Sequence, residues 1–502
     1  MAETQNQTGK NDLPRSTLLL SAVLSLPAFF LGLTVPFIGP DEPRYAEVGR
    51  EMWLSGDLIT PTLGGFHWFE KPALLYWLEA FFYSIFGVNE FAARLGPALC
   101  GLATVLCLWL LGRLALDAPE KPLANWFAVI ASSSLGLITF SHAATTDIVV
   151  TLPLTVAMAA FFVFDRRENS GCRGRSLLGS LALMYLGAGV AMLAKGLIGL
   201  AFPPAIIVFY YILSRRLPSR NILLSALWGI PLTLAVAAIW YVPIYVRYGN
   251  EFIQEFIVRQ HFDRFTTNVF QHPQPFYFYL WVLPLLTLPW LPFFANGVWR
   301  ALRLAVKPAI SNASSSPLLL FSLSWLLVPL IFFSASTSKL PGYVLPAVPP
   351  AIIFAAIAVR GVAGERRIWT WVSAGLACST LLIVSALLVT VFPARARQES
   401  VQPLLQAADN HGLFSAKVLL LHSYNFGAEF YAPGRFDRDA TGKQVQLFGS
   451  EEVKREIQRL GGGTVLVLVS KEYIPKLSEG SDLDAQMLAE NNSGAIFAVS
   501  LK

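Results

Sequence analysis

The stretch "LLLSAVLSLPAFFLGLTVPFIGPDEPRY", residues 18–45, begins with an almost uninterrupted apolar run and ends in Asp41 and Glu42. About 20 consecutive apolar residues are what a helix needs to cross the hydrocarbon core of a bilayer. The run is too long for the core of a signal peptide, and no small-residue cleavage site follows it. We therefore expect a first transmembrane helix near 17–38, preceded by a cytoplasmic tail over residues 1–16.

The rest of the chain repeats this pattern. Of its 502 residues, 54% are hydrophobic and 14% are charged, whereas a soluble domain carries about 25% charged residues. The composition predicts an α-helical polytopic membrane protein with roughly 11–13 transmembrane helices. The apolar runs lie near 17–38, 90–115, 122–141, 147–164, 177–194, 197–213, 221–246, 276–298, 317–335, 343–359 and 369–392.

Basic residues gather in the short links between these runs, which indicates membrane topology. Assigning the basic links to the cytoplasm leaves residues 39–89 and the tail after Pro393 on the opposite side. No basic block with interleaved aromatic residues occurs in a solvated segment, so the sequence argues against nucleic-acid binding. The four cysteines have neither metal-ligand nor disulfide-framework spacing.

The tail has a different character from the apolar runs. "AKVLLLHSYN" (416–425) and "GTVLVLVSKEY" (463–473) are typical of short strands, and "SEEVKREIQRL" (450–460) is typical of a helix. We expect residues 393–502 to form a small periplasmic α/β domain. Residues 17–392 would then form the transmembrane domain, with 39–89 as its first periplasmic loop.

The loop 39–89 is expected to carry two interfacial helices. After Asp41, apolar residues recur at helical spacing between charged ones, and a second helix is expected from Pro72, since proline is favoured in a first turn. A purely structural interpretation is available. Asp41 would be a helix N-cap, and Glu42 and Glu70 would interact favourably with the helix dipole.

Further ionisable residues fall on the same predicted face, where each costs a few kcal/mol at membrane depth. Lysine and arginine there suit a phosphate or pyrophosphate, and nearby acids can act as a base, orient an acceptor or hold a metal. No Walker loop or GxGxxG is present. The pattern favours a site for an anionic, lipid-linked substrate. Its members are Asp41, Glu42, Glu70, Lys71, Asp147, Lys195, Arg259, His261, Lys339 and Tyr343.

Six short motifs, in order between about residues 35 and 350, carry a family resemblance. They are "GPDEPRYAEVGREM", "FHWFEKPALLYW", "TTD", "LAKGLIGLAFP", "QHFDRF" and "SKLPGYVLP". The chain resembles the polyprenyl-phosphate-sugar glycosyltransferases of the GT-C superfamily, close to the bacterial 4-amino-4-deoxy-L-arabinose (lipid A) transferases. It is similar more distantly to the protein O-mannosyltransferases.

The resemblance implies roles for individual residues. It implies Asp41, Glu42 and Asp147 as catalytic acids, and Glu70 with His261 as positions near a divalent metal, such as Zn, Mg or Mn. His261 as a hydrogen-bonding loop residue and Lys195 as a lysine that snorkels to the interface remain alternatives. The donor phosphate would be bound by Lys71, Arg259, Lys339, Tyr343 and Lys195.

The implied function is a membrane glycosyltransferase. It would move a sugar, with inversion, from polyprenyl phosphate, such as undecaprenyl phosphate, to lipid A, another glycan, a lipid or a protein. The site would face the periplasm, in a multi-pass protein of the bacterial inner membrane surrounded by membrane lipids. An enzyme like the protein O-mannosyltransferases is one alternative. A transporter or flippase of an anionic lipid is another, but such sites usually lie near the midplane between repeated halves, and no repeat is visible here.

Overall fold

The computed structural model describes residues 13–172, 174–267, 273–306, 316–422, 424–478 and 482–502. The chain forms two compact units. The helical unit comprises Met1–Leu31, Phe69–Leu75 and Leu95–Ser385, and the mixed unit comprises Gly32–Trp68, Tyr76–Arg94 and Ala386–Lys502. The expected domain limits at 17, 392 and 393 stay a prediction, and most of the expected tail 1–16 lies outside the described residues.

Long apolar helices dominate the chain. Within the described residues, seven are long and apolar enough to cross a membrane, or up to nine spans if two bent pairs are counted. The seven are α5 (Glu90–Ala115), α8 (Thr146–Asn169), α9 (Arg175–Lys195), α11–η1–α12 (Arg220–Thr266), α15 (Ser316–Ala335), η3–α16 (Pro341–Glu365) and α17 (Arg367–Val389). The pairs are α6 (Leu123–Ser132) with α7 (Leu135–Ser141), bent by 52°, and α13 (Phe278–Leu286) with α14 (Leu291–Val306), bent by 120°.

Two shorter apolar helices, α2 (Arg15–Phe30) and α10 (Ile198–Leu213), cover the remaining predicted spans. Each of the eleven predicted runs therefore coincides with an apolar helix or a bent pair. The helical polytopic class is confirmed. The main difference from the expected straight spans is that the α6–α7 and α13–α14 pairs are bent. In both pairs the bend lies in the short non-helical segment between the two helices.

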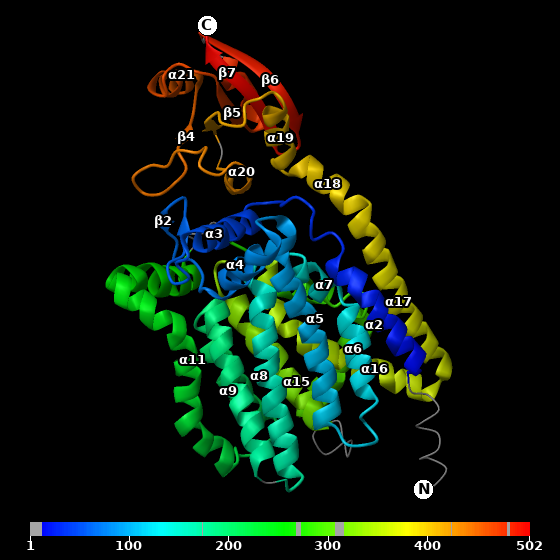
Figure 1. Cartoon of the computed structure of the whole chain (residues 1–502). Coiled ribbons are helices and arrows are strands. Elements are labelled where there is room, and N and C mark those ends of the chain that lie inside the picture. The colour runs from blue at the N-terminus through cyan, green and yellow to red at the C-terminus, as the bar shows by residue number, and fades with distance from the viewer. Residues whose placement is uncertain (1–12, 173, 268–272, 307–315, 423, 479–481) are drawn as a thin grey trace. The chain divides into compact units, whose positions relative to one another are not determined.

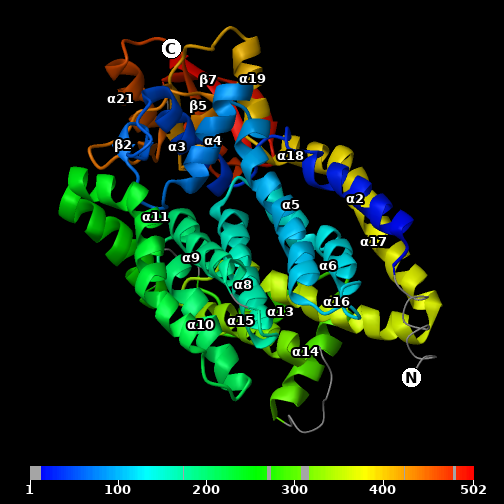
Figure 2. The same ribbon diagram turned by 60° about the horizontal axis from the view of Figure 1, so that its bottom comes forward.

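The interior of the helical unit is built around α8 and α16. Helix α8 packs against α9, α9 packs against α11, and α14 packs against α16; α8 and α9 lie side by side in Figure 1 and in Figure 2. In α8, 83% of the apolar window is buried inside the protein, against 22% in α17. A helix that is apolar on all sides can be buried in this way, whereas the apolar surface of α17 remains available to lipid.

The mixed unit contains a five-stranded sheet in the order β4-β3-β5-β7-β6. Strands β4 (Gln446–Leu447), β3 (Val418–Leu421) and β5 (Val465–Val469) are parallel, and β7 (Gly494–Leu501) and β6 (Leu483–Asn491) add antiparallel pairs. Helix α21 (Ser450–Arg459) covers one face, and α19 (Gln402–Asn410) with α20 (Phe426–Tyr431) covers the other. The expected α/β tail is confirmed, although β6 and β7 were not anticipated.

The first external loop belongs to the same unit. It contains α3 (Asp41–Ser55), the hairpin of β1 (Thr62–Leu63) and β2 (Phe66–His67), and most of α4 (Leu74–Phe86). Helix α3 ends at Gly56, whose φ of 70° is left-handed and typical of a helix C-terminus. Glu51 then accepts hydrogen bonds from Thr62 Oγ1 at 2.6 Å and from the backbone N–H of Gly65 at 3.2 Å. The helix therefore fixes the position of the hairpin.

Helices α3 and α4 meet at a glycine. A Cβ atom added to Gly49 would lie 2.3 Å from Oε2 and 2.8 Å from Cβ of Glu79. Glu79 is fully buried, and within the described part of the chain neither carboxyl oxygen has a hydrogen-bond partner. Burial, with a smaller contribution from Glu42, raises the pKa of Glu79 well above its usual value. Burial therefore favours the protonated, uncharged form of this carboxyl.

Substituting Gly49→Ala should destabilise the mixed unit, because the added methyl overlaps Glu79. Overpacking of this kind costs about 1–3 kcal/mol, so we expect a lower Tm in thermal unfolding of the purified protein. Gly179→Ala is a matched control, since Gly179 is exposed on α9 with no atom within 4 Å of an added Cβ. Alanine is the better helix former, so the control should keep or raise Tm. Equal Tm values for the two variants would contradict the overlap.

Candidate functional site

Asp41 and Glu42 lie in the first turn of α3. The residue that precedes the helix is Pro40, and no side chain caps it, so the expectation that Asp41 is the N-cap is wrong. Instead, Asp41 Oδ1 accepts a hydrogen bond from Arg44 at 2.5 Å, and the Asp41 side chain is 45% exposed. Two acids in the first turn interact favourably with the helix dipole. Asp41 is thus an accessible carboxylate held near its own helix start.

Glu42 has a different environment from Asp41. Both of its carboxyl oxygens accept from Arg94, at 2.8 and 2.9 Å. Arg94 is 1% exposed, and it also donates to the backbone carbonyls of Leu33, at 3.1 Å, and Val35. A bidentate, charge-assisted pair of this kind is strong and directional. Glu42 therefore anchors the loop. In the sequence, Arg94 is a single arginine within "EFAARLGPALC", and this was the only feature that could have drawn attention to it.

In the helical unit, Glu70 lies between two cations. Its Oε1 accepts from Lys71 Nζ at 2.9 Å and from Arg264 at 3.3 Å. Glu70 and Lys71 are both buried, at 8% and 7% exposure. Burial and the nearby Arg264 lower the pKa of Lys71 to about 8, against the opposing effect of Glu70. Two cations therefore lie beside one carboxyl oxygen, and cations held in this way are suited to bind an anion.

A second group in the helical unit joins Asp147, Lys195 and Tyr343. Lys195 Nζ forms an ion pair with Asp147 and lies 4.6 Å from the centre of the Tyr343 ring. A Cβ on Gly342 would come within 2.1 Å of Asp147 Oδ2, so only glycine permits this approach. Lys195 therefore has an acid and an aromatic ring as partners, and the structure brings together three residues that lie far apart in sequence.

Lys339 and Arg259 are engaged separately. Lys339 is buried, and its Nζ donates to the backbone carbonyls of Gln274, at 3.0 Å, and Ser336. Arg259, on η1 (Ile253–Asp263), pairs with Glu255 at 3.0 Å and keeps 52% of its side chain exposed. Within the described residues, neither cation pairs with Glu70 or Asp147. Their expected part in a phosphate clamp stays a prediction.

The donor set expected for a metal does not fit one. His261 Nδ1 hydrogen-bonds to the carbonyl of Phe256 at 2.7 Å, and Nε2 is 3.3 Å from the backbone N–H of Leu197. Glu70 is already shared by two cations. Across the residues that the structure describes, no group of three or more His, Cys, Asp or Glu side chains could hold a metal ion. His261 behaves here as the hydrogen-bonding residue of the alternative interpretation.

Replacing Arg94 with lysine should loosen the loop around Glu42, because one ammonium group cannot reproduce the bidentate pair and both carbonyl contacts. Breaking a buried pair costs about 3–5 kcal/mol when one partner is removed, and a lysine should recover part of that. We expect a lower Tm and faster limited proteolysis within residues 32–42. The control is Arg113→Lys on the same helix, where the arginine is exposed; similar proteolysis of both variants would contradict this anchoring role.

Comparison with known proteins places the chain in a family context. A family model described as dolichyl-phosphate-mannose-protein mannosyltransferase matches residues 28–251. The undecaprenyl phosphate-alpha-4-amino-4-deoxy-L-arabinose arabinosyl transferase of Aeromonas hydrophila is 32% identical over 376 residues, covering 72% of this chain and 65% of the relative. The Aeromonas salmonicida protein of the same name is 33% identical over 377 residues, with 72% and 66% covered. The chain thus spans just under two thirds of these curated relatives.

Solved structures show the same fold. ArnT from Cupriavidus metallidurans bound to undecaprenyl phosphate aligns with a TM-score of 0.76 and 19% identity, over 96% of this chain and 97% of that one. The Archaeoglobus fulgidus oligosaccharyltransferase in complex with Zn and sulfate aligns with a TM-score of 0.54 and 12% identity, over 97% and 73%. The resemblance expected from the six motifs is confirmed. The chain is a multi-pass protein of the bacterial inner membrane with a GT-C-like fold.

Proposed function

We propose that this chain, with its GT-C-like fold, transfers a sugar from an undecaprenyl-phosphate-linked donor to an acceptor at the periplasmic face, with inversion. The observation that carries the proposal is that Lys71, which is buried, and Arg264, which is half-buried, both bind one oxygen of the buried Glu70. Cations held in fixed positions such as these are suited to bind a phosphate. The curated relatives are named as arabinosyl transferases that use undecaprenyl phosphate, which supports the same donor chemistry.

On the donor side, the phosphate is the leaving group. Negative charge grows on its oxygen as the sugar departs, and cations already fixed in place stabilise that charge without reorganising. Lys71 and Arg264 are the residues to which we assign this role. Lys195, paired with Asp147 and stacked on Tyr343, and the separately engaged Lys339 and Arg259 are proposed as further phosphate contacts.

On the acceptor side, Asp41 is the accessible acid. For a hydroxyl acceptor it would remove the proton as the sugar arrives, and for an acceptor that is already anionic it would only orient the attacking oxygen. Glu42 would act as a positioning residue through Arg94, and Asp147 would hold Lys195. Lipid A, another glycan and a protein are the acceptor classes that this chemistry accommodates.

No step is assigned to a metal ion. One similar solved structure is described as a complex with Zn and sulfate. Here Glu70 Oε1 is shared by two cations, and both ring nitrogens of His261 are hydrogen-bonded. If chelation of divalent metals lowers activity, we expect the metal to be bound by residues other than Glu70 and His261. A His261→Gln variant should therefore lose the same fraction of its activity on chelation as the wild-type protein does. A variant that no longer responds to chelation would contradict this expectation.

Substituting Asp41→Asn should lower sugar transfer by about 10²–10⁴-fold, the range typical of losing a general base. The measurement is consumption of an undecaprenyl-phosphate-linked sugar by the purified protein in the presence of a glycan acceptor that offers only hydroxyl groups. The matched control is Asp484→Asn, since Asp484 is an exposed acid on β6. Unchanged consumption with Asp41→Asn would remove the role given to Asp41, and movement of intact donor across the bilayer without consumption would favour a transporter.

Donor binding should weaken as the pH rises through about 8. Lys71 has its pKa lowered to about 8, so its positive charge is present below that pH and is lost above it. We expect the KM for donor to rise between pH 7 and 9 in the wild-type protein. Lys71→Arg keeps its charge over this range and should show a flat profile. Parallel profiles for the two proteins would contradict the assignment of Lys71 to the phosphate.

A further inference from the structure

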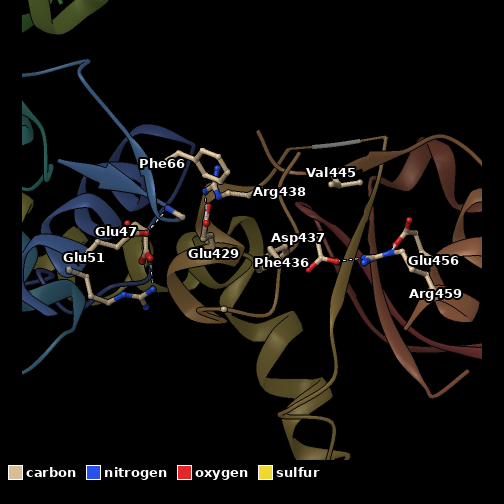
Figure 3. A pocket seen from close by; sticks show the side chains of 13 residues that line it. Glu47, Glu51, Phe66, Glu429, Phe436, Asp437, Arg438, Val445, Glu456 and Arg459 are labelled. Carbon is tan, nitrogen blue, oxygen red and sulfur yellow. Dashed lines mark hydrogen bonds and ion pairs between the residues drawn. The ribbon is translucent and has the colours of Figure 1, made fainter. Parts of the chain in front are cut away.

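The mixed unit contains a cleft of about 680 Å³ that the proposed chemistry does not use. Figure 3 shows its walls: Glu47 and Glu51 come from α3, Phe66 from the hairpin, Glu429 from α20, and Glu456 with Arg459 from α21. The first external loop and the C-terminal domain therefore both contribute to it. Sites for small molecules typically measure about 300–1,000 Å³, so the cleft has the size of a binding site.

The charges that line the cleft are arranged in pairs. Arg50 pairs with Glu47, Arg438 with Glu429, and Arg459 with Asp437. Two further acids, Glu51 and Glu456, also line the cleft, so carboxyl groups outnumber guanidinium groups by five to three. A phosphate would meet no unpaired cation here and several acids. The lining disfavours an anionic ligand.

Two buried side chains beside the cleft retain unused hydrogen-bonding capacity. Glu47 and Arg50 are 2% and 8% exposed, and within the described residues Glu47 Oε2 and Arg50 Nε have no partner. Burial raises the pKa of Glu47 to about 8, although Arg50 opposes this. A polar atom buried without a partner costs about 1–3 kcal/mol. A hydroxyl group satisfies such a site well, since one oxygen both donates and accepts.

Aromatic side chains complete the cleft. Phe66 is 40% exposed, and it lies over Gly442, where an added Cβ would come within 2.7 Å of the ring. Phe436 also lines the cleft. A sugar ring presents an apolar C–H face that packs on an aromatic ring and a rim of hydroxyl groups that bond to paired acids and arginines. Few other ligands need both features together.

We propose that this cleft binds an uncharged carbohydrate segment of the acceptor, with Phe66 under the sugar ring and the Glu47–Arg50 pair bonded to its hydroxyl groups. This rests on the proposed function, because it makes the cleft an acceptor subsite. Glu47 and Glu51 follow Asp41 on α3 by six and ten residues, which corresponds to about 9 and 15 Å along the helix axis. The cleft therefore holds the acceptor at a distance from the oxygen that reacts.

The test measures binding without donor. The full-length protein in nanodiscs is titrated calorimetrically with the β-1,6-linked disaccharide of N-acetylglucosamine, with the same disaccharide carrying two phosphates, and with inorganic phosphate. We expect Phe66→Ala to raise the Kd of the uncharged disaccharide by about tenfold, as the loss of an aromatic contact predicts. Phe66→Trp should keep the wild-type Kd. Arg459→Ala, an exposed change at the opposite wall, should also weaken binding.

The control is Phe414→Ala, an exposed aromatic residue of the same unit outside the cleft, which should leave Kd unchanged. Equal Kd values for wild type and Phe66→Ala would overturn the proposal. It would also be overturned if the phosphorylated disaccharide bound more tightly than the uncharged one and inorganic phosphate displaced it. In the transfer assay, Phe66→Ala should raise the acceptor KM and leave kcat unchanged. Donor consumption without disaccharide binding would refute the cleft alone, whereas disaccharide binding without donor consumption would refute the proposed function alone.

Discussion

The bidentate pair between Arg94 and Glu42 is the interaction on which the first external loop depends. Arg94 is 1% exposed, and its guanidinium binds Glu42 and two backbone carbonyls in the segment that precedes α3. A buried guanidinium is tolerated only when its donors are satisfied, so the loop has little freedom to adopt another path. The start of α3, and with it the exposed Asp41, takes its position from this pair.

The same constraint governs the buried and half-buried charges of the helical unit. Ions at membrane depth are expensive, and pairing offsets part of that cost. Glu70 is shared by Lys71 and Arg264, and Asp147 is matched by Lys195. The two groups differ in balance. Two cations bind Glu70, whereas one lysine pairs with Asp147, and this difference is the reason for assigning the Glu70 group to a phosphate. In the cleft of the mixed unit the arginines are paired with acids and the acids are more numerous, so this cleft favours an uncharged ligand over an anionic one.

Sequence reasoning predicted the apolar helices at their observed places and the strands at 416–425 and 463–473. It was wrong about the N-cap, because the backbone enters α3 through Pro40 and Asp41 turns to Arg44 instead. It did not find Arg94, Glu79 or the cleft. Arg94 and Glu79 look like ordinary interruptions of apolar stretches, and nothing near them in sequence reveals their partners. Strand β6, "LDAQMLAEN", was not predicted, because its alanines and charged residues interrupt the alternation of apolar and polar residues that is typical of a strand.

The sequence by itself determined the membrane class, the order of the helices, the α/β character of the tail and the family resemblance, because these follow from local hydrophobicity and from short motifs. Only the tertiary structure decided which ions share a partner. Lys195 meets Asp147 across 48 positions, and Arg264 meets Glu70 across 194. Such pairings depend on how distant helices pack, and packing is set by contacts that no local pattern encodes. The grouping of cations around each acid, and hence the ligand proposed for each group, was therefore decided by the tertiary structure.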